Sequence, residues 1–300
     1  MNSRNEGLWV GFATLTAVLG CSDGGGFDEV AVGAVSQRSI CGATDWQNVE
    51  TYDGTLGTTI PFVDAHKQAV GVMRWKSDLA SRYTNPGNVN GEEWCSGTLI
   101  SNTQFLTAGH CFDRDGEDWT WPRVNGTSTA ISSAQGATEM LVDFNYQLDA
   151  AGNEEPITTV GVTSLAEYRQ SALDYAIIEL AGTPGIQFGK TVPGDFQLPV
   201  GAPITIIQHP DGRPKKVHAG TVTSSASASV AYDKADTSGG SSGAGVLDNV
   251  TGYLEGVHTT PGCTIAGGSN SGTPVFTIYN YSLIMRQRAM DPAKIMTIML

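Results

Sequence analysis

The stretch D-T-S-G-G-S-S-G-A-G-V-L-D at residues 236–248 contains two serines that each fit a pattern for a nucleophile. Ser241 is the centre of G-x-S-x-G, in which the serine lies on a sharp turn between a strand and a helix. Ser242 fits G-x-S-G, a glycine-rich loop that needs no helix after it. Residues 244–257 instead form two strand-like runs joined by a turn at 249–252. The acid and the histidine that Ser241 would need after it in the sequence would also have to lie within the few residues that follow, which is too close for that fold. The sequence therefore favours Ser242.

The rest of the chain also has the pattern of short strands. β-Branched and aromatic residues fill the candidate strands, and Gly, Asn, Asp and Pro lie between them. The candidates are 69–75, 96–101, 104–108, 140–144, 175–180, 203–208, 216–224, 244–248, 253–259 and 274–278. One helix is expected near 281–290, and 41–68 is expected to be an extended arm with turns. This pattern, without strand–helix alternation, predicts an all-β barrel or sandwich.

The formal net charge is −13, from 17 basic and 30 acidic residues. Such a charge argues against nucleic acid or an anionic membrane surface as a partner, because both repel an acidic protein. The spacing of the cysteines includes no C-x-x-C pair, and no calcium-loop pattern is visible. We therefore expect no metal and no cofactor.

The N-terminus has the pattern of an export signal. Arg4 precedes an apolar stretch at 8–20, which is too short to span a bilayer comfortably and suits the core of a signal peptide. The sequence V-L-G-C that ends it resembles a bacterial lipobox, which implies lipidation of Cys21; the alternative is an ordinary secretion signal with an incidental cysteine. Residues 1–20 are thus a predicted signal and 21–68 a tether with an N-terminal arm or pro-segment. We expect an exported protein, anchored in the bacterial cell envelope or secreted.

The segment C-S-G-T-L-I-S-N-T-Q-F-L-T-A-G-H-C at 95–111 closely resembles the histidine segment of the trypsin/chymotrypsin superfamily. The resemblance implies that His110 is a general base and that Cys95 and Cys111 form a disulfide. L-D-Y-A-I-I-E-L at 173–180 resembles the aspartate strand of the same family, which makes Asp174 the third member of a triad with Ser242. In such a triad, the imidazole takes the proton of the serine and the carboxylate orients the imidazole.

Further expectations follow from the same resemblance, which spans roughly residues 69–285. The implied fold is two six-stranded antiparallel β-barrels with a short C-terminal helix, in a peptidase domain at 69–300. The N–H groups of Gly240 and Ser242 would form the oxyanion hole. The implied function is a serine endopeptidase acting on polypeptide substrates, and we expect a monomer. The alternative is a catalytically inactive homologue that serves as a binding module.

Within the superfamily, the chain most resembles the glutamyl-endopeptidase-like branch, through T-A-G-H-C, Ser241 in place of an aspartate, and G-V-H-T-T-P-G-C near the end. Because Ser241 is not an aspartate, a trypsin-type activation switch should be absent. Thr237 and His258 match positions that hold an acidic substrate side chain. Asp236, however, lies where trypsin carries the acid that binds Arg or Lys. We expect acidic residues before the scissile bond, with basic residues or a small or mixed preference as the alternatives. A purely structural role is the alternative for His258.

The remaining cysteines and histidines have simpler interpretations. If Cys21 carries lipid, Cys41 and Cys263 are left over, and a bridge between them would tie the arm to the pocket region. His209 is expected in a Pro/Gly loop. His66 and His218 have no partner pattern in the sequence.

Overall fold

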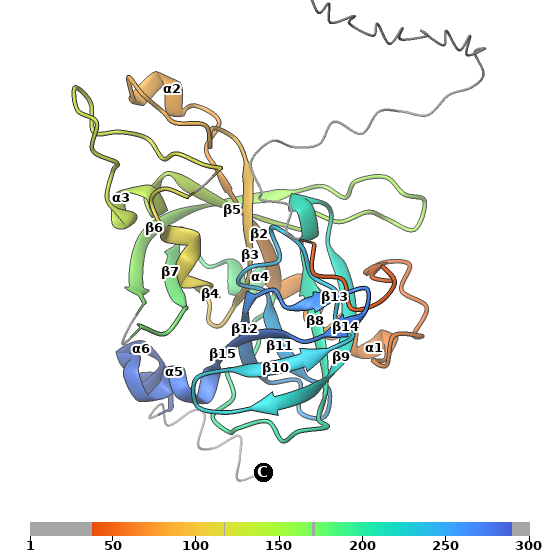
Figure 1. Ribbon diagram of the computed structural model, residues 1–300. Helices are drawn as coiled ribbons and strands as arrows, with labels where there is room; N and C mark the ends of the chain where they lie inside the picture. The colour runs from red at the N-terminus through yellow and green to blue at the C-terminus, as the bar shows by residue number, and fades with distance from the viewer. Residues whose placement is uncertain (1–37, 117, 170–171, 290–300) are drawn as a thin grey trace, which may run out of the picture. The chain divides into compact units, whose positions relative to one another are not determined.

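The computed structural model describes residues 38–116, 118–169 and 172–289. Figure 1 shows the described chain as two groups of strands, the first orange to green and the second mostly cyan to blue. The first group is a closed antiparallel barrel in the order β2-β3-β4-β7-β6-β5. Its strands are β2 (Val70–Trp75), β3 (Glu93–Leu99), β4 (Gln104–Thr107), β5 (Met140–Phe144), β6 (Thr158–Tyr168) and β7 (Ala176–Leu180).

The second group is a seven-stranded antiparallel sheet in the order β1-β9-β10-β15-β12-β11-β8. A further pairing of β8 with β9 closes six of these strands into a second barrel and leaves β1 as an addition from the N-terminal arm. The strands are β1 (Gln47–Asn48), β8 (Pro203–Gln208), β9 (Lys216–Ser225), β10 (Val230–Asp233), β11 (Gly245–Asp248), β12 (Leu254–Thr260) and β15 (Asn270–Pro274). A small hairpin, β13 (Cys263–Thr264) with β14 (Gly267–Gly268), projects beside it.

Helices are few and short, and they lie outside the barrels (Figure 1). The α-helices are α1 (Ile60–His66), α2 (Leu79–Arg82), α3 (Ser133–Thr138), α4 (Pro184–Gln187), α5 (Val275–Tyr281) and α6 (Leu283–Ala289). Short 3-10 segments are η1 (Lys67–Ala69), η2 (Gly109–Phe112) and η4 (Pro210–Gly212). No helix in the described ranges has the length and apolar character needed to cross a membrane.

Two apolar clusters fill the barrels. The larger one combines the first barrel with the arm and the C-terminal helices, and it includes Trp75, Phe105, Phe144 and Ile178, all fully buried. The smaller one lies inside the second barrel and includes Ile204, Ile206, Val230, Tyr232 and Val246. Alternate strand residues point inwards and interdigitate, and the larger cluster continues into the second barrel through residues such as Ile207, Val217 and Val257.

The predicted fold is confirmed: the chain forms two six-stranded antiparallel barrels with a short helical C-terminus. The predicted strand at 274–278 is wrong, because α5 begins at Val275 and buries Val275, Ile278 and Tyr279 at helical spacing. The extended arm is also interrupted by α1, whose first turn is capped by the Thr59 hydroxyl, which accepts from the Phe62 N–H at 3.3 Å. The predicted signal at 1–20 and Cys21 lie outside the described residues.

Candidate active site

His110 and Asp174 meet because they flank the same end of a strand pair. In the β4–β7 ladder, Thr107 is opposite Ala176, so the chain leaving β4 and the chain entering β7 lie at one edge of the first barrel. The His110 Nδ1 is 2.8 Å from the Asp174 Oδ2, and the His110 backbone N–H donates to the Asp174 Oδ1 at 2.7 Å. Both carboxylate oxygens therefore orient His110, and the ring nitrogen left for other partners is Nε2.

Asp174 is also held by charge. The Arg169 guanidinium lies 3.8 Å from the Asp174 Oδ1 and forms a closer ion pair with Asp113 at 2.7 Å. Burial by itself would raise the pKa of the Asp174 carboxyl, but hydrogen bonds and charge from His110, together with Arg169, outweigh burial and lower the pKa. The carboxylate thus stays ionised beside the imidazole at neutral pH.

Ser242 lies in a loop of the second barrel that is anchored to the first. The Ser96 N–H of β3 donates to the Ser242 carbonyl at 2.8 Å, and the Gly243 N–H donates to the His258 carbonyl at 2.8 Å. A Cβ on Gly243 would come within 2.1 Å of the Thr107 Oγ1 and 2.8 Å of the Ala108 nitrogen, and the backbone has a φ of +88°. Only glycine fits there, so the serine loop can pack against the segment that leads to His110.

The N–H groups of Gly240 and Ser242 are free to bind a ligand. Neither donates a hydrogen bond to another described residue. Gly240 has a φ of +83°, a conformation that glycine adopts without strain. Two such donors on one loop can stabilise the negative oxygen that develops during acyl transfer.

His258 is buried on β12 and bonded to Tyr232 of β10. The Tyr232 hydroxyl is 2.5 Å from the His258 Nδ1. Burial, with a smaller contribution from the charge of His110, lowers the pKa of His258 to about 3, so the ring is neutral at pH 7. Thr237 lies shortly before Ser242 in the sequence, and its buried Oγ1 has no hydrogen-bond partner among the described residues. A buried hydroxyl without a partner is typical of a site that a polar ligand fills.

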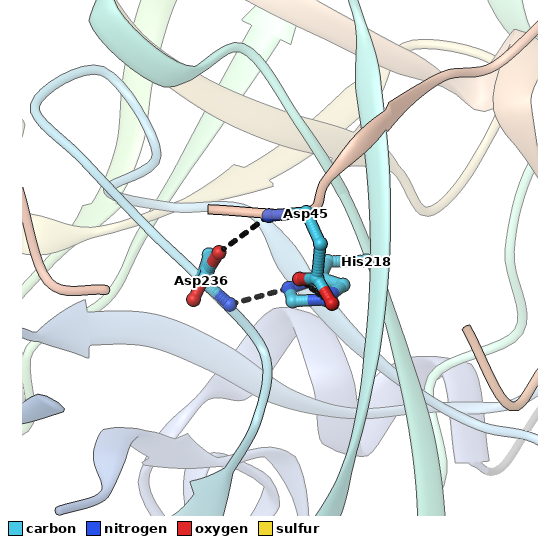
Figure 2. A group of neighbouring side chains, drawn as sticks. All are labelled: Asp45, His218 and Asp236. Carbon is cyan, nitrogen blue, oxygen red and sulfur yellow. Dashed lines mark hydrogen bonds and ion pairs between the residues drawn. The ribbon is translucent and has the colours of Figure 1, made fainter. Parts of the chain in front are cut away.

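Asp236 faces the N-terminal arm (Figure 2). Its Oδ1 accepts from the Cys41 N–H at 2.8 Å, and its Oδ2 accepts from the Asp45 N–H at 3.2 Å. The Asp236 N–H donates to the His218 Nδ1 at 2.6 Å, and the His218 Nε2 is 2.7 Å from the Asp45 Oδ1. Asp236 is completely buried, and its carboxylate forms its hydrogen bonds with the arm, whereas His258 bonds to Tyr232. This contact of Asp236 and His218 with the arm could not be read from the sequence.

Asp45, His218 and Asp236 also form a group of possible metal ligands, since one ligand atom from each lies within 4.8 Å of the others. Each of these atoms except the second Asp45 oxygen, however, already has a hydrogen-bond partner within the group or the arm. These hydrogen bonds explain the cluster, because they attach the arm to the second barrel.

Both expected disulfides are present. Cys95–Cys111 joins β3 to the turn that carries His110. Cys41–Cys263 joins the arm to the β13–β14 hairpin. Ser39 reinforces the second connection, because it pairs with Thr237 through two backbone hydrogen bonds of 2.8 and 3.1 Å. The arm therefore lies directly against the residues that precede the serine loop.

The chain has two barrels, with a His–Asp pair on one and a glycine-rich serine loop on the other. It belongs to the family of trypsin-like peptidase domains, whose model matches residues 95–257. Solved structures agree on the fold. A Glu endopeptidase in complex with MPD is 19% identical, with a TM-score of 0.50, over 74% of this chain and 90% of its own.

A second similar structure is the inactive form of a serine-to-alanine mutant of Rv3671c from M. tuberculosis H37Rv. It is 14% identical, with a TM-score of 0.50, over 84% of this chain and 99% of its own. No curated protein matched the sequence.

Proposed function

We propose that the protein is a serine endopeptidase in which Ser242 is the nucleophile, His110 the general base and Asp174 the orienting carboxylate. The observation that carries this proposal is the double contact of Asp174 with His110, at 2.7 Å to the backbone N–H and 2.8 Å to Nδ1. Because Nδ1 is engaged, Nε2 is the nitrogen that takes the proton from the Ser242 hydroxyl during attack. The imidazolium that forms is then stabilised by the ionised Asp174.

The reaction proceeds in two acyl-transfer steps. Attack by the Ser242 Oγ on the scissile carbonyl forms a tetrahedral oxyanion, which accepts hydrogen bonds from the N–H groups of Gly240 and Ser242. His110 then gives its proton to the leaving amine, and the acyl-enzyme forms. Water, deprotonated by His110, releases the acyl group in the second step. Each oxyanion donor typically contributes about 10²- to 10³-fold to kcat.

We further propose a preference for acidic residues before the scissile bond. The Thr237 hydroxyl is a buried donor without a partner in the described chain, and the neutral His258 can take up a proton when a carboxylate approaches. Asp236 does not compete for this role, because both of its oxygens accept backbone N–H groups of the arm. A basic substrate side chain would therefore find no free carboxylate at that position.

A fluorophosphonate probe tests the nucleophile. Wild-type protein should be labelled, Ser242→Ala should abolish labelling, and Ser241→Ala should retain most of it. Ser241 is a matched control because its buried hydroxyl accepts from the Ser238 N–H at 3.0 Å and so serves the loop structure. Labelling that persists in Ser242→Ala would overturn the assignment. Digestion of a peptide library then tests the preference, and cleavage after Arg or Lys would contradict it.

We also propose that the protein is exported and lipid-anchored through Cys21. The lipobox-like V-L-G-C sequence and the two disulfides, which persist in oxidising compartments, support this proposal. Incorporation of radiolabelled palmitate into the wild type, and its loss in Cys21→Ser, is the expected result. Labelling that is equal in both proteins would refute the anchor.

A further inference from the structure

The two candidate oxyanion donors belong to peptide units whose carbonyls are held in different ways. A trans peptide is planar, and its C=O and N–H point in opposite directions, so whatever holds the carbonyl also aims the N–H. The carbonyl paired with the Ser242 N–H is that of Ser241, and it accepts from the Ala244 N–H at 2.9 Å within the loop's own turn. The Ser242 donor is thus oriented locally.

The carbonyl paired with the Gly240 N–H is that of Gly239, and it is held from a distant segment. The Asp211 N–H donates to the Gly239 carbonyl at 2.6 Å. Among the described residues, this is the only hydrogen bond that the Gly239 carbonyl accepts. The orientation of the Gly240 N–H therefore depends on the position of the Asp211 backbone in η4.

Asp211 is itself placed by an uncommon backbone conformation and by its side chain. Its φ is 55° and its ψ is 26°, in the left-handed region that Asp and Asn tolerate better than most residues. Its Oδ1 accepts from the Ser238 hydroxyl, and its Oδ2 forms an ion pair with Arg38 of the arm at 3.5 Å. The carboxylate thus connects the turn, the serine loop and the arm.

Packing leaves little freedom for this turn. A Cβ on Gly240 would lie 2.6 Å from the His209 carbonyl and 2.8 Å from the Gly212 nitrogen, so the turn rests directly on the loop. The Ser96 hydroxyl accepts from the His209 N–H at 2.9 Å and donates to the Gly240 carbonyl at 2.8 Å, which fixes both segments to β3. A small shift of Asp211 would consequently be transmitted to the Gly239–Gly240 peptide.

We propose that Asp211 is a positioning residue that aims the Gly240 N–H at the oxyanion, an inference that rests on the proposed peptidase function. The Asp211 side chain acts through Ser238 and through the left-handed turn, and it does not touch the substrate.

The test compares Asp211→Ala with Asp211→Asn. Alanine removes the acceptor for Ser238 and strains the left-handed turn, whereas asparagine keeps a side-chain oxygen and tolerates that conformation. We expect Asp211→Ala to lower kcat about 10²-fold, the loss typical of one oxyanion donor, with KM changed less than about threefold. Asp211→Asn should remain within about threefold of wild type, and Ser238→Ala should show a smaller loss of kcat than Asp211→Ala.

Inhibitor binding separates positioning from a general structural role. A peptide boronate, which mimics the tetrahedral intermediate, should lose affinity for Asp211→Ala in parallel with kcat, whereas a ground-state peptide inhibitor should bind unchanged. Asp149→Ala is the matched control, because Asp149 also caps a turn, by accepting the N–H groups of Ala151 and Asn153 at 2.8 Å. It should have wild-type kinetics.

The outcomes distinguish the two proposals. If wild-type protein neither reacts with the probe at Ser242 nor cleaves peptides, the proposed function fails and this inference falls with it. If the wild type is active and Asp211→Ala keeps its kcat, only the role of Asp211 is refuted. If both Asp211→Ala and Ser238→Ala lose as much affinity for the ground-state inhibitor as for the boronate, the role of Asp211 is also refuted, because such losses would indicate that the whole site has collapsed.

Discussion

Acidification should destabilise this protein through two buried neutral histidines, and His209 allows the effect to be measured by itself. His209 is completely buried; its Nδ1 is 3.0 Å from the Arg213 carbonyl, and its Nε2 has no partner among the described residues. Burial, with a smaller contribution from the charge of Lys215, lowers the pKa of His209 to about 3, against 6.5 for an unperturbed histidine.

The sign of the effect follows from proton binding. Between pH 6.5 and about 3, the unfolded chain binds a proton at His209 that the folded protein does not bind, so the free energy of unfolding falls as the pH falls. The slope is about 1.4 kcal/mol per pH unit, which gives a loss of about 2 kcal/mol at pH 5 relative to neutral pH. His258, whose pKa is also about 3, should add a similar loss.

Urea unfolding of wild type and His209→Asn at pH 7 and pH 5 measures this contribution. Asparagine keeps an N–H donor for the Arg213 carbonyl but cannot be protonated, so the variant should lose about 2 kcal/mol less than wild type over this interval. Between pH 8 and pH 7 the two proteins should change alike, which provides an internal control. Equal losses between pH 7 and pH 5 would show that His209 is protonated in the folded state, and the reasoning would be refuted.

Three further results are expected. Replacing both Cys41 and Cys263 with serine should lower the free energy of unfolding by about 5 kcal/mol, because the bridge closes a loop of 222 residues; the urea midpoint of the oxidised wild type is the reference. Asp174→Asn should keep the fold, checked by circular dichroism, but lower kcat by about 10⁴-fold, because the imidazole loses its orienting carboxylate. Thr237→Val should lower kcat/KM about 10- to 100-fold for peptides with Glu before the scissile bond, and leave peptides with Ala there unchanged.

The barrels could be predicted from the sequence because most strands are continuous runs of β-branched residues between turn residues. Segments 140–144 and 203–208 match β5 and β8 residue for residue. No strand is predicted from the sequence for the segment that becomes β6, whose exposed and partly buried residues alternate irregularly around two register shifts. The segment at 274–278 looked like a strand because it is β-branched, yet the spacing of its buried residues is helical.

The site was less accessible to sequence reasoning wherever it depends on contacts between distant loops. His110, Asp174 and Ser242 stand in recognisable local patterns. The contact of Asp211 with the Gly239 carbonyl depends on a left-handed turn whose sequence, P-D-G, is compatible with several turn types. No local pattern marks Asp236 as a partner of the arm, since the two backbone N–H groups that donate to its carboxylate lie 191 and 195 residues away.

The connection between the arm and the pocket wall also has a consequence for the order in which the domain can be completed. Cys41 leaves the ribosome early and Cys263 leaves it 222 residues later, so their bridge cannot form until nearly all of the second barrel has been synthesised. The same holds for the pairing of Ser39 with Thr237 and of Asp236 with the Cys41 N–H. The wall around the proposed substrate pocket is therefore assembled from the first and the last parts of the domain to be made, and a nascent chain cannot carry a finished pocket.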